Sequence, residues 1–431
     1  MYLYPKDLVN VIKQSWTKTK YHKDEKIAPL PSDDILQTII EVCYHASFLT
    51  EESRKIGFRV VLENVDSLKN LRNEFSLIKF SERRKFSISE IMRLAPATDL
   101  QKMFIGIEQV GNELEIWGIL DISSSWWDFT HGESSSGFPP PNCFSVSAIE
   151  PGNLTISRGM MNILSLRNGK MERPLSGVFY NGPISDFFKL SYKQFYDEIC
   201  KELKVKKYDS DGHDNDYPYR VFVDFIDRII FNIRNKHHGG AILFVKDDLN
   251  LTDIRLTDRV NVKYGSVYDK SWNLLKKDLI LHRKYYDLYF SFEKKPINDK
   301  SFRELSHIDS EIEDNKRAIK DSIKLISSLS GVDGAIIMTD KLRLLCFGGE
   351  VKVDSPTLKE IKRAENISGE KGSNIPIESF GTRHRSAFRF CSSYEDAMAI
   401  VISQDGGVKA VKRVGSELIL WPDINTGNFG M

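Results

Sequence analysis

The amino-acid sequence predicts an α/β fold, α+β overall, in two main domains. The chain of 431 residues is long enough for two or three domains. Its first half contains one helical segment followed by short strand-like runs, and its second half alternates strand-like runs with helical segments. A polar stretch at 208–216 separates a domain expected at 1–207 from a domain expected at 217–431.

The composition excludes several classes of protein. Hydrophobic residues make up 41% and charged residues 28%, so each domain can form an ordinary core and a disordered chain is excluded. Lys plus Arg number 61 and Asp plus Glu number 60, giving a net charge of +1. The chain therefore lacks the basic field of a protein that grips nucleic acid through its phosphates.

The sequence also indicates in which cellular compartment the protein is expected. Apolar runs are shorter than the roughly 20 residues of a membrane helix, and the first residues lack the regions of a secretory signal. The five cysteines are widely spaced without a C-x-x-C pair, which argues against a disulfide framework and a thiolate zinc site. We therefore expect a cytoplasmic protein with no membrane partner.

The N-terminal domain is expected to be a helix followed by a β-rich region. Ser32 and Asp33 precede a run with helical spacing of apolar residues, so a helix should begin near Asp33. Gly111 and Asn112 join two strand-like runs as a hairpin, because both residues tolerate the positive φ of a tight turn. The expected strands are 58–62, 103–107, 114–120, 143–149, 153–156 and 163–166.

Two polar stretches of this half are expected to be irregular. The segment 132–141 ends in three prolines and should be stiff and extended. Trp126 and Trp127 before it either cap a pocket or form a half-buried packing pair, and packing is favoured. The stretch 208–216 is rich in Asp, but its Gly is misplaced for a calcium loop and no Glu closes it, so we expect a linker.

The C-terminal domain is expected to alternate strands with helices. Its middle, 270–328, is helix-forming and carries Ile residues at helical spacing. This region is either a helix packed on its own domain, which is favoured, or a surface that faces a partner. The other expected elements of this domain are helices at 219–235 and 384–391 and strands at 241–245, 335–338, 342–347 and 399–403. A helix expected at 193–203 comes before the linker, in the N-terminal domain.

The first of two motifs that carry chemistry is Asp333-Gly334-Ala335, which places a carboxylate at the mouth of a buried strand. Such a carboxylate can hold a divalent cation or accept a proton, and the bare Gly lets a ligand approach the backbone. Alone the triplet is weak evidence, because a turn Asp that leads into a strand has the same pattern.

The second motif, Gly381-Thr382-Arg383-His384-Arg385, lies where a loop should enter a helix. Gly381 permits the turn, Thr382 is the expected N-cap, and free N–H groups at a helix start attract phosphate. Arg383 and Arg385 add guanidinium forks that match phosphate oxygens, while His384 can donate to a phosphate or ligate a metal. The two Arg side chains converge only if the first helical turn is irregular.

Taken together, the two motifs resemble the diadenylate cyclase (DAC) domain family. The run Ala241–Val245 after paired glycines is similar to the opening strand of that family, and Ala399–Ser403 to its closing strand. This resemblance covers 217–415. The N-terminal half resembles instead the divergent, sensor-type (DACNV-like) branch, through Leu94–Asp99 and Ile116–Gly118.

The resemblance implies a C-terminal domain with a mixed central sheet and flanking helices that binds one ATP per protomer. Two protomers would form a homo-oligomer with facing active sites and join two ATP into cyclic di-AMP, releasing pyrophosphate. Asp333 would bind Mg²⁺ or Mn²⁺ and help activate the ribose 3′-hydroxyl, with His384 as a second metal ligand. The implied catalytic residues are Asp333, Arg383, His384 and Arg385, and the implied nucleotide-binding residues are Gly334, Ala335, Gly381, Thr382, Arg383, Arg385 and Ser386.

Departures from the family pattern leave a second hypothesis open. A helical insert at about 265–330 is longer and more charged than the family core needs, and Phe388 and Gln404 stand where acidic residues are frequent. The alternative is a non-catalytic sensor of ATP or a cyclic dinucleotide in bacterial signalling or defence. Direct binding of nucleic acid is not expected.

Overall fold

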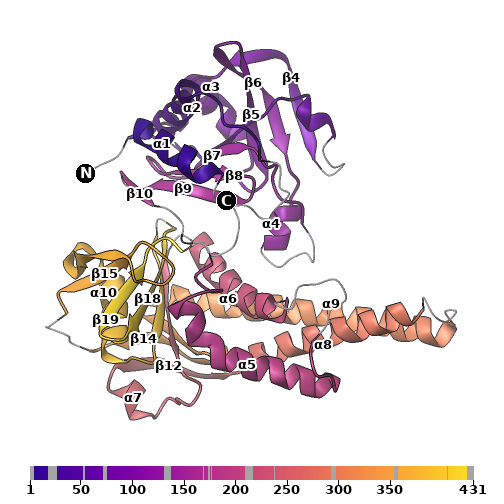
Figure 1. Cartoon of the computed structure of the whole chain (residues 1–431), viewed down its shortest axis with the longest axis vertical. Coiled ribbons are helices and arrows are strands. Elements are labelled where there is room, and N and C mark those ends of the chain that lie inside the picture. Colours follow the sequence, from indigo (N-terminus) through magenta and orange to yellow (C-terminus); the bar gives the residue numbers. More distant parts are fainter. Residues whose placement is uncertain are drawn as a thin grey trace. The chain divides into compact units, whose positions relative to one another are not determined.

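Figure 1 shows the fold in a computed structural model of the whole chain. The structure describes residues 4–424 with gaps at 18–26, 52–53, 71–74, 131–136, 168, 173–174, 176, 209–216, 237, 293–297, 354–357 and 405. Most of the expected linker at 208–216 and part of the expected extended segment at 132–141 therefore lie outside the described residues.

The chain divides into two compact units, at 1–174 and 175–427. This division differs from the expected boundary at 208–216, because helix α5 (Pro183–Leu203) belongs to the second unit. Phe188 and Phe195 of α5 are buried in one core with helix α6 (Tyr217–Asn235) and with strands of that unit. The packing of its apolar side chains places α5 in the second unit. The polar stretch at 208–216, which follows α5, gave no indication of this.

The first unit is built on an eight-stranded sheet with the order β10-β9-β8-β7-β3-β5-β6-β4. Neighbouring strands are antiparallel except for β3 and β5, which are parallel. All six strands expected from the sequence are present, and Gly111 between β5 and β6 has a positive φ of 61°. The strands are β3 (Phe58–Leu62), β4 (Ser76–Lys85), β5 (Met103–Val110), β6 (Glu113–Asp121), β7 (Phe144–Ala148), β8 (Leu154–Arg158), β9 (Met161–Arg167) and β10 (Lys170–Glu172).

Three helices of the first unit pack on one face of this sheet. Helix α2 (Asp33–Ala46) begins where the sequence predicts, and its Ile39 and Ile40 are buried in the same core as Phe58 and Val60 of β3. Because side chains alternate along a strand, Arg59 faces the opposite side. The remaining elements are α1 (Pro5–Trp16), α3 (Ile88–Leu94), α4 (Ser125–Thr130), which carries Trp126 and Trp127, and a separate sheet of β1 (Thr50–Glu51) and β2 (Arg54–Lys55).

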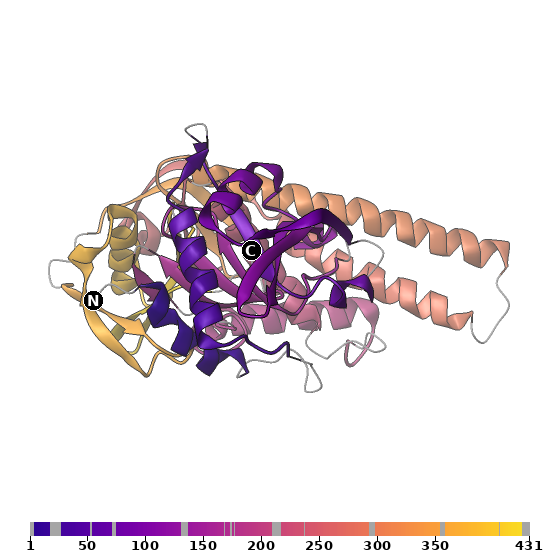
Figure 2. The same cartoon turned by 90° about the horizontal axis from the view of Figure 1, so that it is seen from above.

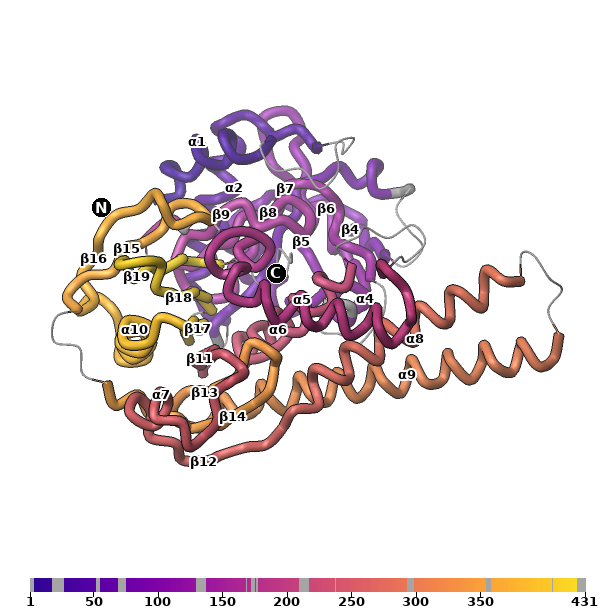
Figure 3. The backbone as a smooth tube through the Cα atoms, turned by 60° about the horizontal axis from the view of Figure 1, so that its bottom comes forward, coloured from indigo at the N-terminus to yellow at the C-terminus, as the bar shows by residue number. Residues whose placement is uncertain are grey.

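The second unit is built on a nine-stranded mixed sheet with the order β12-β14-β13-β11-β17-β18-β19-β15-β16 (Figure 3). The pairs β11–β13 and β15–β19 are parallel and the others are antiparallel. The expected α/β class is therefore correct. The strands are β11 (Gly240–Val245), β12 (Val260–Tyr268), β13 (Ala335–Thr339), β14 (Leu344–Val351), β15 (Glu360–Ala364), β16 (Gly372–Pro376), β17 (Met398–Ile402), β18 (Val408–Val414) and β19 (Glu417–Trp421).

Helices cover both faces of this second sheet. Alternate residues of β11 divide between two cores: Ala241 and Leu243 pack with helix α10 (Thr382–Ser393), and Ile242 and Phe244 pack with α5 and α6. The short helix α7 (Ile254–Thr257) contributes Leu256 to the α10 side. Strand β14 begins later than the sequence predicts, because Leu342 in the preceding turn has a positive φ of 60°.

The expected helical insert is a hairpin of helices α8 (Lys270–Ser291) and α9 (Asp299–Ser328), which extends beyond the sheet of its own unit (Figure 2). Ile319, Ile323 and Ile326 near the base of α9 are buried in the core shared with α5 and α6, so this part packs on its own unit as favoured. The insert begins later than 265, because residues up to Tyr268 form β12. None of the helices in the described part of the chain has the length and apolar character needed to cross a membrane.

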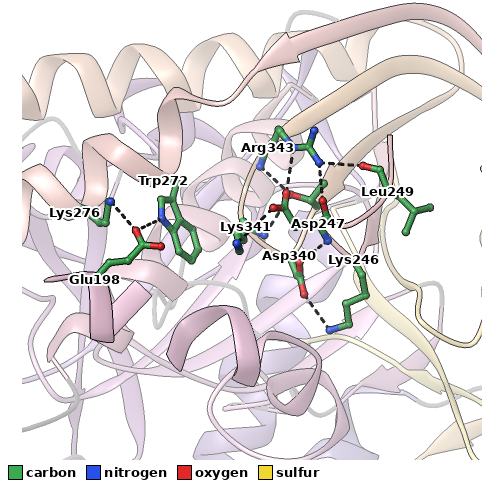
Figure 4. A network of polar contacts seen from close by, with 10 residues as sticks. Glu198, Lys246, Asp247, Leu249, Trp272, Lys276, Asp340, Lys341 and Arg343 are labelled. Atoms are coloured by element: carbon green, nitrogen blue, oxygen red, sulfur yellow. Dashed lines mark hydrogen bonds and ion pairs between the residues drawn. The ribbon is translucent and has the colours of Figure 1, made fainter. Parts of the chain in front are cut away.

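A charged network closes the end of the second sheet where β11 and β13 finish (Figure 4). The Asp340 carboxylate, 4% exposed, accepts hydrogen bonds from Lys246 Nζ at 3.1 Å and the Asp247 N–H at 3.0 Å. Arg343 Nε lies 3.1 Å from Asp247 Oδ1. Because these bonds join three segments, they hold the two strands in register.

Asp340→Ala is expected to lower the free energy of unfolding by about 2–3 kcal/mol, because it leaves the Lys246 ammonium and the Asp247 N–H without their carboxylate. Urea denaturation followed by circular dichroism measures this. Lys341→Ala is the matched control: its Nζ lies 3.6 Å from Asp247 at a more exposed position, so we expect a loss below about 1 kcal/mol. Equal losses in the two variants would contradict the assigned role of Asp340.

Candidate functional site

The Asp333 motif lies at the beginning of strand β13. Ala335 is the first residue of β13 and is buried, while Asp333 and Gly334 before it are exposed. Strand β13 is parallel to β11, with Ile336 beside Ile242. Because the two strands are parallel, both begin at the same edge of the sheet, so Asp333 before β13 and Gly239 before β11 lie at that edge.

Gly334 is required by the packing of two strands. It has a positive φ of 118°, and a Cβ atom there would lie 2.5 Å from the carbonyl carbon of Gly348 in β14. From the sequence, the missing side chain was expected to let a ligand approach the backbone. The structure gives a different cause, since the backbone of β14 occupies the space that a side chain would need.

The basic motif lies at the start of helix α10. The N-cap is Gly381 rather than the expected Thr382, which is the first helical residue, and no side chain among the described residues caps the N–H groups of the first turn. The helix is regular from its first residue, so Arg383 and Arg385, at about 100° per residue, point to different sides. Ser386 is half-buried and lies one turn after Thr382.

Arg383 and His384 reach the same strand end as Asp333. A Cβ atom on Gly239 would lie 2.6 Å from Arg383 Nη1, so the guanidinium packs directly against this glycine. On the other side of β11, Ile402 of the antiparallel β17 pairs with Gly240, which places Ser403 beside Gly239. The Ser403 hydroxyl lies 3.5 Å from His384 Nε2.

The two motifs therefore lie at one edge of the second sheet, where β11 and β13 begin and β17 ends. Neighbouring strands are about 4.8 Å apart, so the positions level with Gly239 on β13 and β17 are about 10 Å apart. The structure brings together Asp333, Arg383 and His384 and leaves Arg385 on another side of α10. Ala335 lies one step into the sheet, on the face that packs with α10.

The charges at this edge are available to a ligand. Within the part of the chain that the structure describes, the side chains of Asp333 and Arg383 make no hydrogen bond or ion pair. The uncapped N–H groups of the first α10 turn add the positive end of the helix dipole. Such an edge can accept a polyphosphate, with one carboxylate left to meet a cation.

Sequence reasoning missed one residue of this edge, His238. Its Nδ1 lies 2.6 Å from the Gly239 carbonyl oxygen, and its Nε2 would lie 3.9 Å from a Cβ atom on Gly331, near Asp333. The position of His238 directly before the paired glycines of the opening strand was the available signal. Only the structure shows that this residue lies beside Gly331, two residues before Asp333.

The structure explains why Phe388 stands where acidic residues are frequent in the family that the sequence resembles. Its side chain is buried on the face of α10 that packs on the sheet, and its ring lies 5.1 Å from that of Phe380, edge to face. An acidic residue there would enter an apolar core, which strongly disfavours a charge. Gln404, the other departure, is exposed.

Comparison with known proteins gives two findings. Residues 25–121, in the first unit, match the family described as "Probable sensor domain DACNV". Among solved structures, the chain is similar to the crystal structure of DacA from Staphylococcus aureus in a double cysteine mutant. That match has 15% identity, covers 48% of this chain and 89% of the other, and has a TM-score of 0.24. A comparison with curated proteins found no match. The matched range includes Leu94–Asp99 and Ile116–Gly118, on which the sensor-type resemblance rested.

Proposed function

We propose that this chain is a nucleotide signalling protein whose second unit binds ATP at the sheet edge formed by Asp333 and the start of α10. In the proposed reaction, two protomers with facing sites condense two ATP into cyclic di-AMP. The observation that supports this proposal is that both motifs lie at the sheet edge where β11 and β13 begin and β17 ends. The match of residues 25–121 to a sensor domain supports a signalling role for the first unit.

The residues at the edge have the chemistry that this reaction needs. Each ribose 3′-hydroxyl attacks the α-phosphorus of the opposite ATP, one P–O bond forms, and the bond to pyrophosphate breaks. Such phosphoryl transfer depends on alignment and on stabilisation of charge. Arg383 and the N–H groups of the first α10 turn would hold phosphate oxygens, and Asp333 would orient the attacking hydroxyl.

A divalent cation fits the donor set at this edge. Mg²⁺ in nucleotide sites usually takes one or two carboxylates together with phosphate oxygens and waters. Asp333 is an exposed carboxylate and His384 lies at the same edge, while nowhere in the described ranges do three His, Cys, Asp or Glu side chains gather. The nucleotide would therefore supply most ligands. Bound Mg²⁺ or Mn²⁺ would neutralise charge that develops on the phosphates.

Incubation of the full chain with ATP and Mn²⁺ is expected to yield cyclic di-AMP and two pyrophosphates per product. Liquid chromatography with mass spectrometry detects the dinucleotide, and a parallel sample with EDTA should give none. Absence of product from protein that binds ATP and is dimeric would contradict the condensing activity while leaving the nucleotide site intact.

A non-catalytic nucleotide sensor is the second candidate, and buried Phe388 favours it because an acidic residue frequent in the family is absent there. This candidate predicts that ATP or cyclic di-AMP raises the melting temperature without forming product, because a ligand that binds only the native state stabilises it by mass action. Differential scanning fluorimetry with product analysis on the same sample separates the two candidates.

A further inference from the structure

Helices α8 and α9 form an antiparallel pair that packs along one seam. Along each helix, residues that are buried or half-buried recur at alternating steps of three and four, which is the pattern of a coiled coil. Contacts across the pair agree with this pattern. The Ser271 and Ser322 hydroxyls are 3.1 Å apart, and Asn315 Nδ2 donates to the Leu274 carbonyl oxygen at 3.0 Å. The seam residues are Ser271, Leu274, Asp278, Leu281, Tyr285 and Leu288 in α8, and Leu305, Ile308, Ile312, Asn315, Ile319, Ser322 and Ile326 in α9.

The outer half of the pair, 282–291 and 299–311, is the part that extends furthest from the sheet of its own unit, and we call it the arm tip (Figure 2). Every residue of these two ranges is half-buried or exposed. Four aromatic side chains of the arm tip lie off the seam: Tyr286, Tyr289, Phe290 and Phe302. Tyr289 is 51% exposed and Phe302 is 61% exposed. Packing between α8 and α9 therefore does not account for these aromatic residues.

The aromatic residues continue the side of the hairpin that is covered at its base. Leu275 and Leu279 of α8 are buried in the core with α5 and α6. At about 100° per residue, the three aromatic residues of α8 point to the same side of the helix as these two leucines. Phe302 likewise points to the same side of α9 as Ser327, whose Oγ lies 3.3 Å from the Ile229 carbonyl oxygen of α6. The arm tip thus extends a helix-packing surface beyond the helices that cover it.

Both signs of charge occur on the arm tip in nearly equal number. It carries four basic and five acidic residues, a net charge of −1. An anionic membrane or a nucleic acid would instead require a basic surface. A surface that meets a copy of itself must present both signs, because a single sign would repel itself. The basic residues are Arg283, Lys284, Lys300 and Arg303, and the acidic residues are Asp287, Asp299, Glu304, Asp309 and Glu311.

We propose that the arm tip is a contact surface for the arm tip of a second copy of this chain. Two hairpins that meet through their aromatic sides form a four-helix arrangement, in which each pair supplies the helix layer that the other lacks. Exposed Tyr289 and Phe302 are the anchors, because aromatic side chains contribute most of the binding energy in many protein interfaces. The proposal does not depend on nucleotide binding by the second unit.

The size of the arm tip limits how tightly two copies bind. Its helices are about 15–20 Å long and together about 20 Å wide, so one side offers about 300–400 Å². Stable protein interfaces bury about 800 Å² on each partner. We therefore expect a weak, reversible dimer.

Sedimentation velocity of the full chain without nucleotide, at about 5–500 µM, is expected to show reversible formation of a dimer. Tyr289→Glu/Phe302→Glu should raise the Kd for self-association at least about tenfold, because it brings like charges together in the contact. Wild-type protein that stays monomeric over the whole range would overturn the proposal. A dimer that is unchanged in the double variant would lie on another surface and would overturn it as well.

Ser291→Glu/His307→Glu is the matched control. It adds the same number of carboxylates at exposed residues of the arm tip, but these residues point away from the aromatic side. The control should keep the wild-type Kd for self-association. Both double variants should keep the wild-type melting temperature within about 2 °C, because all four positions are exposed. If Tyr289→Glu/Phe302→Glu alone loses melting temperature where the wild type is monomeric, a segment of the same chain covers the arm tip, which would contradict the proposed dimer.

Discussion

Asp333→Asn is expected to reduce formation of cyclic di-AMP by roughly 10³-fold while changing the Kd for ATP less than about threefold. The carboxylate is exposed at the start of β13 and makes no hydrogen bond or ion pair with the described residues, so its loss does not disturb the fold. Asn has the same shape but no charge, so it can neither hold a cation nor orient the 3′-hydroxyl as a base. Single-turnover assays and isothermal titration calorimetry separate the two effects.

Asp396→Asn is the matched control for this prediction. Asp396 is also an exposed Asp two residues before a strand, but it precedes β17 at the end of the sheet away from Ser403. Its substitution should leave both product formation and ATP binding unchanged. If Asp333→Asn retains product formation, the assigned role of Asp333 is wrong. If neither protein forms product, loss of the Mg²⁺ dependence of ATP binding in Asp333→Asn alone would support the sensor instead.

Most strands with a strongly apolar pattern were predicted from the sequence, although β18 and β19 were missed, and exposed edge strands were not predicted. Residues 58–62 and 241–245 are largely buried, and their apolar residues gave clear signals. Strand β12 lies at the sheet edge and is mostly exposed, as is β16 at the other edge. Their sequences therefore carry little hydrophobic pattern, and pairing with a neighbour rather than local preference forms them.

The sequence of helix α1 contains a helical pattern, but the helix was not predicted. Leu8, Val9 and Ile12 are spaced as on one helical face, and Pro5 stands at the first helical turn. These side chains are buried in the core with α2. The boundary between the units, by contrast, depended on where α5 packs, and no local pattern contains that information.

The residues of the candidate site could be predicted from the sequence, but their arrangement in space could not. Asp333 and Arg383 stood out because their motifs are specific, yet their proximity depends on β11 lying between β13 and β17. The roles of two glycines could also be assigned only from the structure. Gly334 and Gly239 each make room for an atom far away in the sequence, the backbone of Gly348 in one case and the Arg383 guanidinium in the other.

Arg383→Gln is expected to raise the Kd for ATP by roughly 10- to 100-fold, because it removes charge-assisted hydrogen bonds to phosphate. Arg385→Gln should raise it less than about fivefold, because a regular α10 turns Arg385 away from the side where Arg383 meets Gly239. Calorimetry with ATP and Mg²⁺ measures both values, and Arg389→Gln, further along the same helix, controls for loss of one positive charge.

Comparing the Kd for ATP between the two Arg variants tests the proposed geometry more strictly than either Kd alone. Both residues carry the same charge and lie in the same helical turn, so long-range attraction to ATP falls almost equally in the two variants. A difference between them must therefore come from direct contact. Equal losses would mean that the first turn of α10 rearranges when ATP binds, so that both guanidiniums reach the phosphates. A larger loss of ATP affinity in Arg385→Gln than in Arg383→Gln would place the phosphates on the other side of α10, away from Gly239 and Asp333. That result would contradict the proposed function.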